Sequence, residues 1–153
     1  AASDVYKRQY VNKLEKEIEY IDSAFAKYES SKANFTQEEK DSSFFVIEEY
    51  MHSLEVTEAE QADYSEENYN RMDKKYNAVG LEIWSEEGMM YLMPDMKFLE
   101  KKFKKDISVE LDDYLDVIKV ISRQTTSDAG LSVEWSELSD MIIACEKYLV
   151  ENY

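Results

Sequence analysis

The feature that most constrains this chain is an apolar seam of strict three-four spacing close to its N-terminus. Charged residues fill the positions between the members of the seam, which are Val11, Leu14, Ile18, Ile21, Phe25 and Tyr28. Because an α-helix places residues three and four apart on one face, this spacing predicts a long amphipathic helix with one buried side. Such a helix needs further elements that cover its seam.

Later segments repeat the helical spacing, and each one follows residues that can cap a helix. Two capping boxes are predicted, Thr36 with Glu39 and Thr57 with Glu60, and the single N-cap candidates are Ser65, Asp95 and Ser108. The predicted buried faces are Phe44, Ile47, Met51 and Leu54; Tyr69, Met72, Tyr76 and Val79; Leu111, Leu115, Ile118 and Ile121; and Trp135, Leu138, Ile142, Cys145 and Leu149, with Met141 and Tyr148 beside this last set. Polar loops are expected at 29–34 and 123–130.

One segment departs from the helical period. Residues 81–84 and 89–93 are two short runs of bulky side chains on either side of Ser-Glu-Glu-Gly, and Pro94 ends the second run. This arrangement predicts a small antiparallel β-hairpin at about 81–93, with Gly88 in the left-handed conformation.

These elements predict a mainly α fold. Three glycines and one proline in 153 residues are too few turn residues for an all-β fold, so long helices are favoured. We expect one domain, a bundle of five to six helices with the single hairpin, whose first two helices form an antiparallel pair.

The charge is strongly and unevenly negative. The net charge is −16, which disfavours binding to nucleic acid or to an anionic membrane surface and leaves a basic protein as a possible partner. Asp41–Asn70 holds nine acids without a lysine or arginine, whereas Lys97–Lys105 holds five lysines and one acid. No apolar run is long enough to predict a transmembrane segment.

The sequence offers little for catalysis, metal binding or a cofactor. Cys145 is the only cysteine and lies among apolar residues, which is typical of a buried structural thiol. Glu49 and His52 have the spacing of a di-iron ligand pair, but a second copy is impossible with a single histidine. Adjacent carboxylates diverge around a helix and do not form acid–base pairs. We therefore expect no enzyme activity; an enzyme would have to use carboxylates and tyrosines alone.

The best candidate for a binding surface is the hairpin. A hairpin turns only one face to a core, so either Met89, Tyr91 and Met93 or Met90 and Leu92 should remain exposed near Trp84. We predict non-catalytic binding of a protein or ligand. The predicted partner-binding residues are Trp84, Glu86, Met89, Tyr91 and Met93, together with Glu58, Glu60 and Asp63 of the acidic stretch.

The first nine residues, AASDVYKRQ, resemble translated sequencing-adapter read-through in a metagenomic bacterial gene. The resemblance implies that the native domain covers 10–153 and that upstream sequence is missing. Cytoplasmic and extracytoplasmic locations then both remain open. The alternative to an interaction protein is thus a secreted or lipid-anchored bacterial envelope protein whose signal peptide is missing from this fragment.

Overall fold

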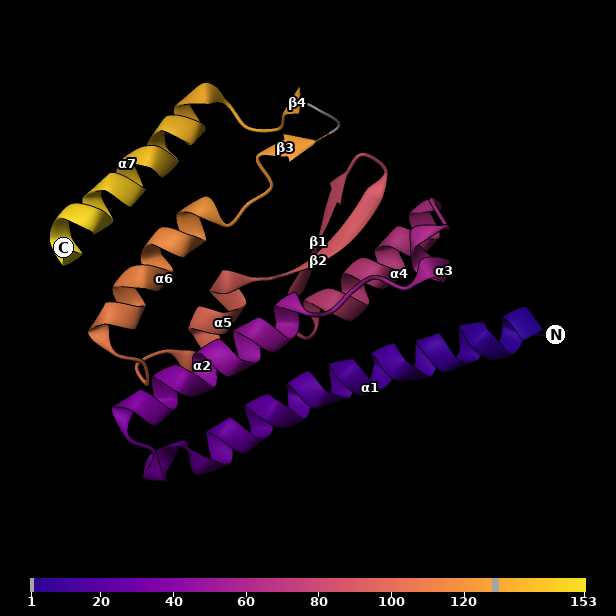
Figure 1. Cartoon of the computed structure of the whole chain (residues 1–153), viewed down its shortest axis with the longest axis horizontal. Helices are drawn as coiled ribbons and strands as arrows, with labels where there is room; N and C mark the ends of the chain where they lie inside the picture. Colours follow the sequence, from indigo (N-terminus) through magenta and orange to yellow (C-terminus); the bar gives the residue numbers. More distant parts are fainter. Residues whose placement is uncertain (1, 128–129) are drawn as a thin grey trace.

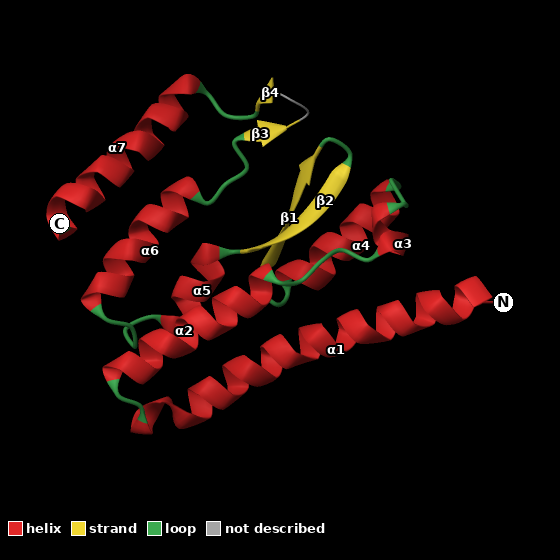
Figure 2. Ribbon diagram, viewed as in Figure 1, coloured by secondary structure: helices red, strands yellow, loops and turns green. Residues whose placement is uncertain are grey.

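A computed structural model describes the backbone of residues 2–127 and 130–153, and the side chains of 13–126 and 130–153. The helices are α1 (Ala2–Ser31), the 3-10 helix η1 (Lys32–Asn34), α2 (Gln37–His52), α3 (Glu58–Gln61), α4 (Glu66–Asn77), α5 (Met96–Phe103), α6 (Val109–Ile121) and α7 (Trp135–Asn152). The strands are β1 (Leu81–Glu86), β2 (Met89–Pro94), β3 (Thr126–Ser127) and β4 (Gly130–Leu131). The predicted mainly α fold with a hairpin at 81–93 is confirmed (Figure 2).

Helices α1 and α2 lie side by side and antiparallel, while α6 and α7 form a second helical pair at the opposite side of the molecule (Figure 1). The hairpin β1–β2 and helices α4 and α5 lie between these pairs. Within the described residues, every helix is too short or too polar to cross a lipid bilayer.

The core forms where the seam of α1 meets α2, α4, α5 and α6. Among the seam residues with described side chains, Ile18 is half-buried and the others are buried: Leu14, Ile21, Phe25 and Tyr28. Phe103 of α5 occupies the centre of an aromatic group, with ring centroids 4.5 Å from Tyr28 and 5.3 Å from Phe44. The predicted face of α2 is buried in full.

The predicted helix caps are also found. Thr36 with Glu39 and Thr57 with Glu60 form complete capping boxes. Side chains of the three single N-caps accept backbone amides at the start of their helices, namely Ser65, Asp95 and Ser108. Since each cap joins residues no more than three positions apart, local sequence was sufficient to locate them.

Three local predictions need correction. The predicted loop at 29–34 is helical, because α1 continues to Ser31 and η1 follows directly. Part of the loop predicted at 123–130 pairs as β3 and β4, while residues 128–129 lie outside the described residues. In α4, Tyr69 is exposed and Asn68 is buried instead, because Asn68 donates hydrogen bonds to the backbone carbonyls of Glu60 and Asp63.

The predicted line of buried residues on the last helix is wrong, although Met141, predicted beside that line, is buried. Helix α7 packs mainly against α6, and Met141 is its only buried residue within the described part of the chain. Leu138 and Cys145 are half-buried, whereas Trp135, Ile142 and Leu149 are exposed. One neighbouring helix covers only one side of α7, and that side is centred on Met141.

Gly80, between α4 and β1, has a positive φ of 81° and lies against the ring of Phe98. A Cβ at this position would clash with the Phe98 ring. The positive φ would also be strained for a residue that carries a side chain. We therefore expect Gly80→Ala to lower the free energy of unfolding by about 2 kcal/mol, measured by urea titration. Gly88 is the control, because its φ is 77° but a Cβ there would meet nothing within 4 Å. Equal losses in the two variants would contradict the packing argument.

Candidate binding site on the hairpin

The β1–β2 hairpin closes with a two-residue turn in which both Glu87 and Gly88 have positive φ, at 51° and 77°. Positive φ at both central residues is typical of a type I′ turn, whose twist suits a two-stranded hairpin. The predicted left-handed Gly88 is confirmed. The cross-strand pairs are Leu81–Pro94, Glu82–Met93, Ile83–Leu92, Trp84–Tyr91, Ser85–Met90 and Glu86–Met89.

This register gives the hairpin a core face and an outer face. Leu81 and Leu92 are buried on the core face, and Met90 packs against the core beside them. The outer face carries three residues of β2, Met89, Tyr91 and Met93, opposite Glu86, Trp84 and Glu82 of β1. Met89 and Tyr91 are 47% and 49% exposed. Of the two sets that the sequence left open, the structure therefore turns the Met89/Tyr91/Met93 set outward, with Met93 half-buried.

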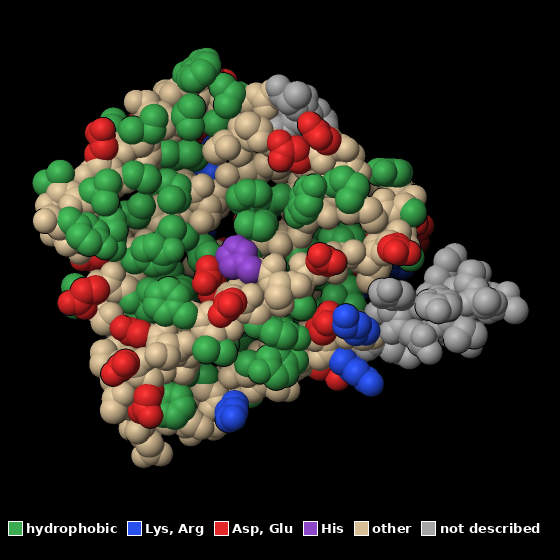
Figure 3. Space-filling model, viewed as in Figure 1, with side chains coloured by type: hydrophobic (Ala, Val, Ile, Leu, Met, Phe, Trp, Pro, Cys, Tyr) green, Lys and Arg blue, Asp and Glu red, His purple; other side chains and the backbone are tan. Residues whose placement is uncertain are grey.

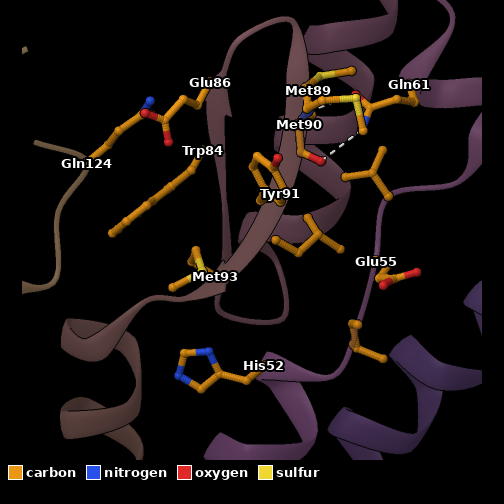
Figure 4. A pocket seen from close by; sticks show the side chains of 13 residues that line it. His52, Glu55, Gln61, Trp84, Glu86, Met89, Met90, Tyr91, Met93 and Gln124 are labelled. Atoms are coloured by element: carbon orange, nitrogen blue, oxygen red, sulfur yellow. Dashed lines mark hydrogen bonds between the residues drawn. The ribbon is translucent and has the colours of Figure 1, made fainter. Parts of the chain in front are cut away.

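Two glutamines hold the edges of the hairpin next to the turn. On the β2 edge, Gln61 donates to the carbonyl of Met90 at 3.0 Å and accepts the Met90 amide at 2.7 Å (Figure 4). On the β1 edge, Gln124 accepts the Ser85 amide at 3.0 Å and donates to the Ser85 carbonyl. Each side-chain amide thus replaces a neighbouring strand at one position, which satisfies the backbone groups of Met90 and Ser85 and stiffens the hairpin there.

Trp84 is fixed on the outer face by a hydrogen bond from its indole Nε1 to Glu82 Oε1, at 2.8 Å. Burial raises the pKa of Glu82, and the hydrogen bond from Trp84 offsets only part of this effect. Glu86 accepts a hydrogen bond from Thr126 Oγ1 at 2.7 Å, which ties β1 to β3. The acidic residues of the outer face therefore hold the hairpin in place as well as giving it charge.

A pocket of about 420 Å³ lies against the outer face and the β2 edge. Figure 4 shows Gln124 on one side of the hairpin and Glu55 on the other, with His52 below Met93. In the space-filling view, the histidine lies beside a hollow near the middle of this face (Figure 3). The lining residues are His52, Leu54, Glu55, Val56, Gln61, Trp84, Glu86, Met89, Met90, Tyr91, Leu92, Met93 and Gln124.

The pocket brings together five of the eight predicted partner-binding residues. They are Trp84, Glu86, Met89, Tyr91 and Met93. The sequence analysis missed His52, Glu55, Gln61 and Gln124 as lining residues. Gln61 and Gln124 are far from the hairpin in sequence and match no motif, so local patterns held no signal for them.

The other three predicted residues, Glu58, Glu60 and Asp63, do not line this pocket. Glu58 and Asp63 are exposed on and after α3, and Asp63 accepts the backbone amide of Ser65 at 3.0 Å. Hydrogen bonds from Ser65 lower the pKa of Asp63. Asp63 thus stabilises the turn that leads into α4.

Glu60 is only 6% exposed, so it is removed from the partner-binding set. Its carboxylate accepts hydrogen bonds from Lys75 Nζ at 2.9 Å, Tyr76 OH at 2.8 Å and Thr57 Oγ1 at 3.0 Å. Burial alone would raise the pKa of Glu60, but the bonds from Lys75 and Tyr76 outweigh it and lower the pKa. Glu60 therefore joins α3 to α4 inside the protein.

The remaining polar candidates of the sequence analysis are His52, Glu49 and Cys145. His52 Nε2 lies 3.0 Å from Glu48 Oε1 and does not pair with Glu49. Cys145, predicted to be buried, is half-buried. Among the described side chains, no three of the types His, Cys, Asp and Glu are grouped so that they could hold a metal ion.

The basic cluster at 97–105 lies on and just after α5, which packs against α2 at the start of the acidic stretch at 41–70. In the part of the chain with described side chains, none of its five lysines forms a salt bridge, and Lys102 instead lies 5.4 Å from the ring centroids of Phe25 and Phe98. The two regions therefore lie on neighbouring helices without being joined by salt bridges between described side chains.

No protein-family model, curated protein or solved structure matches this chain.

Proposed function

We propose that this protein is a non-catalytic binding protein, and that its hairpin pocket receives a large apolar side chain of a partner with a basic residue next to it. The observation that carries the proposal is the outer-face set of exposed Met89 and Tyr91 with half-buried Met93 and Trp84, on a pocket of about 420 Å³. Exposed aromatic and methionine side chains in a concave site are typical of recognition surfaces.

The rigidity of the hairpin supports this proposal. Gln61 and Gln124 hold both edges, and Glu82 orients the Trp84 ring. A site that is already ordered loses less conformational entropy when a partner binds. Aromatic side chains held in this way can act as anchors, while the flexible methionines adapt to the shape of the bound group.

The charge around the pocket supports a basic partner. Among the described side chains that line it, Glu55 and Glu86 are acidic, His52 is the only basic type and no lysine or arginine is present. With a net charge of −16, the whole chain attracts cations over a long range at low salt. An apolar group flanked by lysine or arginine therefore matches the site.

We expect a short peptide of alternating leucine and lysine, about six residues long, to bind the pocket and shift the emission of Trp84 to the blue. The titration uses Trp135→Phe, which leaves Trp84 as the only tryptophan. Peptides of this length form no stable helix, so they report on the pocket as extended ligands. Tyr91→Ser should weaken binding about tenfold, which corresponds to the loss of one aromatic anchor.

The control variant is Tyr69→Ser, because Tyr69 is 45% exposed but belongs to α4 and does not line the pocket. A leucine–glutamate peptide of equal length controls for charge. The proposal fails if the two peptides bind equally well, or if Tyr69→Ser weakens binding as much as Tyr91→Ser does.

A further inference from the structure

Helix α7 presents an exposed stripe with the spacing of a coiled-coil seam. We define the α7 stripe as Trp135, Leu138, Ile142, Cys145 and Leu149, which alternate steps of three and four. Trp135 is 74% exposed, Ile142 54% and Leu149 56%. Figure 3 shows hydrophobic side chains gathered over α7 and α6. Apolar surface of this extent on one helix is typical of a docking site.

The shape of the stripe suits another helix. In a helix pair, apolar residues at three-four spacing interlock along the contact, and each helix needs such a stripe. The stripe follows α7 over most of its length, from Trp135 to Leu149. Because α6 covers the side of α7 around Met141, the stripe remains open to a further helix.

The charges on α7 indicate the charge that a partner helix should carry. The helix carries four carboxylates and one lysine; Glu137 pairs with Arg123 at 2.9 Å and Glu151 with Lys147 at 3.8 Å. Asp140 and Glu146 have no cationic partner among the described residues. Glu146 follows Ile142 by four positions and precedes Leu149 by three, so it borders the stripe.

From this arrangement we infer that the α7 stripe docks a cationic amphipathic helix of a partner protein, with apolar residues on the stripe and lysine or arginine near Glu146. A second copy of this chain would bring another net charge of −16 and another Glu146, so repulsion disfavours it. This inference concerns a surface other than the hairpin pocket and does not depend on the proposed function.

The test is a titration with a synthetic helical peptide of the same length as α7, with leucine at three-four spacing and lysine at the flanking positions. It uses Trp84→Phe, in which Trp135 of the stripe is the only tryptophan. We expect saturable binding, a blue shift of Trp135 emission and weaker binding as salt rises. Ile142→Ser should weaken binding about tenfold without lowering the Tm, since Ile142 is already exposed.

Val46→Ser is the matched control, because Val46 is an exposed aliphatic residue of α2, away from α7, and should leave binding unchanged. A second peptide with glutamate in place of lysine should bind at least about tenfold more weakly. The inference is overturned if both peptides bind alike, if Ile142→Ser and Val46→Ser have equal effects, or if no binding occurs. Sedimentation that reveals a dimer dissociated by Ile142→Ser would also overturn it.

Discussion

Replacing Phe103 by alanine is expected to lower the free energy of unfolding by about 4 kcal/mol and the Tm by about 10 °C. Phe103 is fully buried, and its ring contacts Phe25, Tyr28 and Phe44 from two other helices. Removing the ring leaves a cavity where α1, α2 and α5 meet, which the rigid helices fill only in part. Urea titration and calorimetry would measure the loss.

The control for this prediction is Phe45→Ala. Phe45 is adjacent to Phe44 in α2 and contacts its ring, but it is about half exposed. We expect that variant to lose about 1 kcal/mol. A similar loss for Phe103→Ala would show that the aromatic group around Phe103 is not the centre of the core.

Replacing Glu60 by alanine is expected to lower the free energy of unfolding by about 3 kcal/mol. The substitution leaves the Tyr76 hydroxyl and the Lys75 ammonium without the carboxylate that accepts their hydrogen bonds. Tyr76 is fully buried, so water cannot readily replace the lost partner. Glu58→Gln, on the same short helix but exposed, should change stability by less than about 0.5 kcal/mol.

The contribution of Glu60 should depend on pH. Because its folded-state pKa lies below the ordinary value of 4.5, the folded protein binds this proton less readily than the unfolded chain does. The stabilisation is therefore complete above pH 4.5 and is lost as the pH falls through the folded-state pKa. The difference in unfolding free energy between the wild type and Glu60→Gln should shrink on acidification. A difference that stays constant from neutral to acidic pH would contradict this account.

Part of the candidate site could be derived from the sequence. The hairpin was located where the helical spacing of apolar residues gives way to two short runs of bulky residues around Gly88. Because side chains of a strand alternate between its two faces, only two sets of residues could be the exposed one. The choice between them depends on which face meets the core. Gln61 and Gln124 reach the hairpin only through the folded chain, so their role required the structure.

The burial of individual acidic residues also could not be predicted from the sequence. Glu60 has the same type and neighbourhood in sequence as Glu58, yet it is buried because Lys75 and Tyr76 of α4 lie opposite it. A run of acidic residues indicates the overall electrostatic potential of a chain. It does not indicate which of those residues is exposed to solvent and which is buried. The capping box of Thr57 and Glu60 was predicted from spacing, whereas the bonds from Glu60 to α4 join residues 15 and 16 positions apart in the chain.

The sequence by itself determined most of the helices and their caps, the hairpin and the negative charge, because each follows from interactions between residues a few positions apart or from composition alone. Only the tertiary structure decided which apolar faces are covered. On α7, apolar residues occupy much of the helix circumference, including Met141, Ile142 and Ile143, so the pattern allows several buried faces. Packing on α6 covers the Met141 side, and the stripe predicted to be core remains largely at the surface.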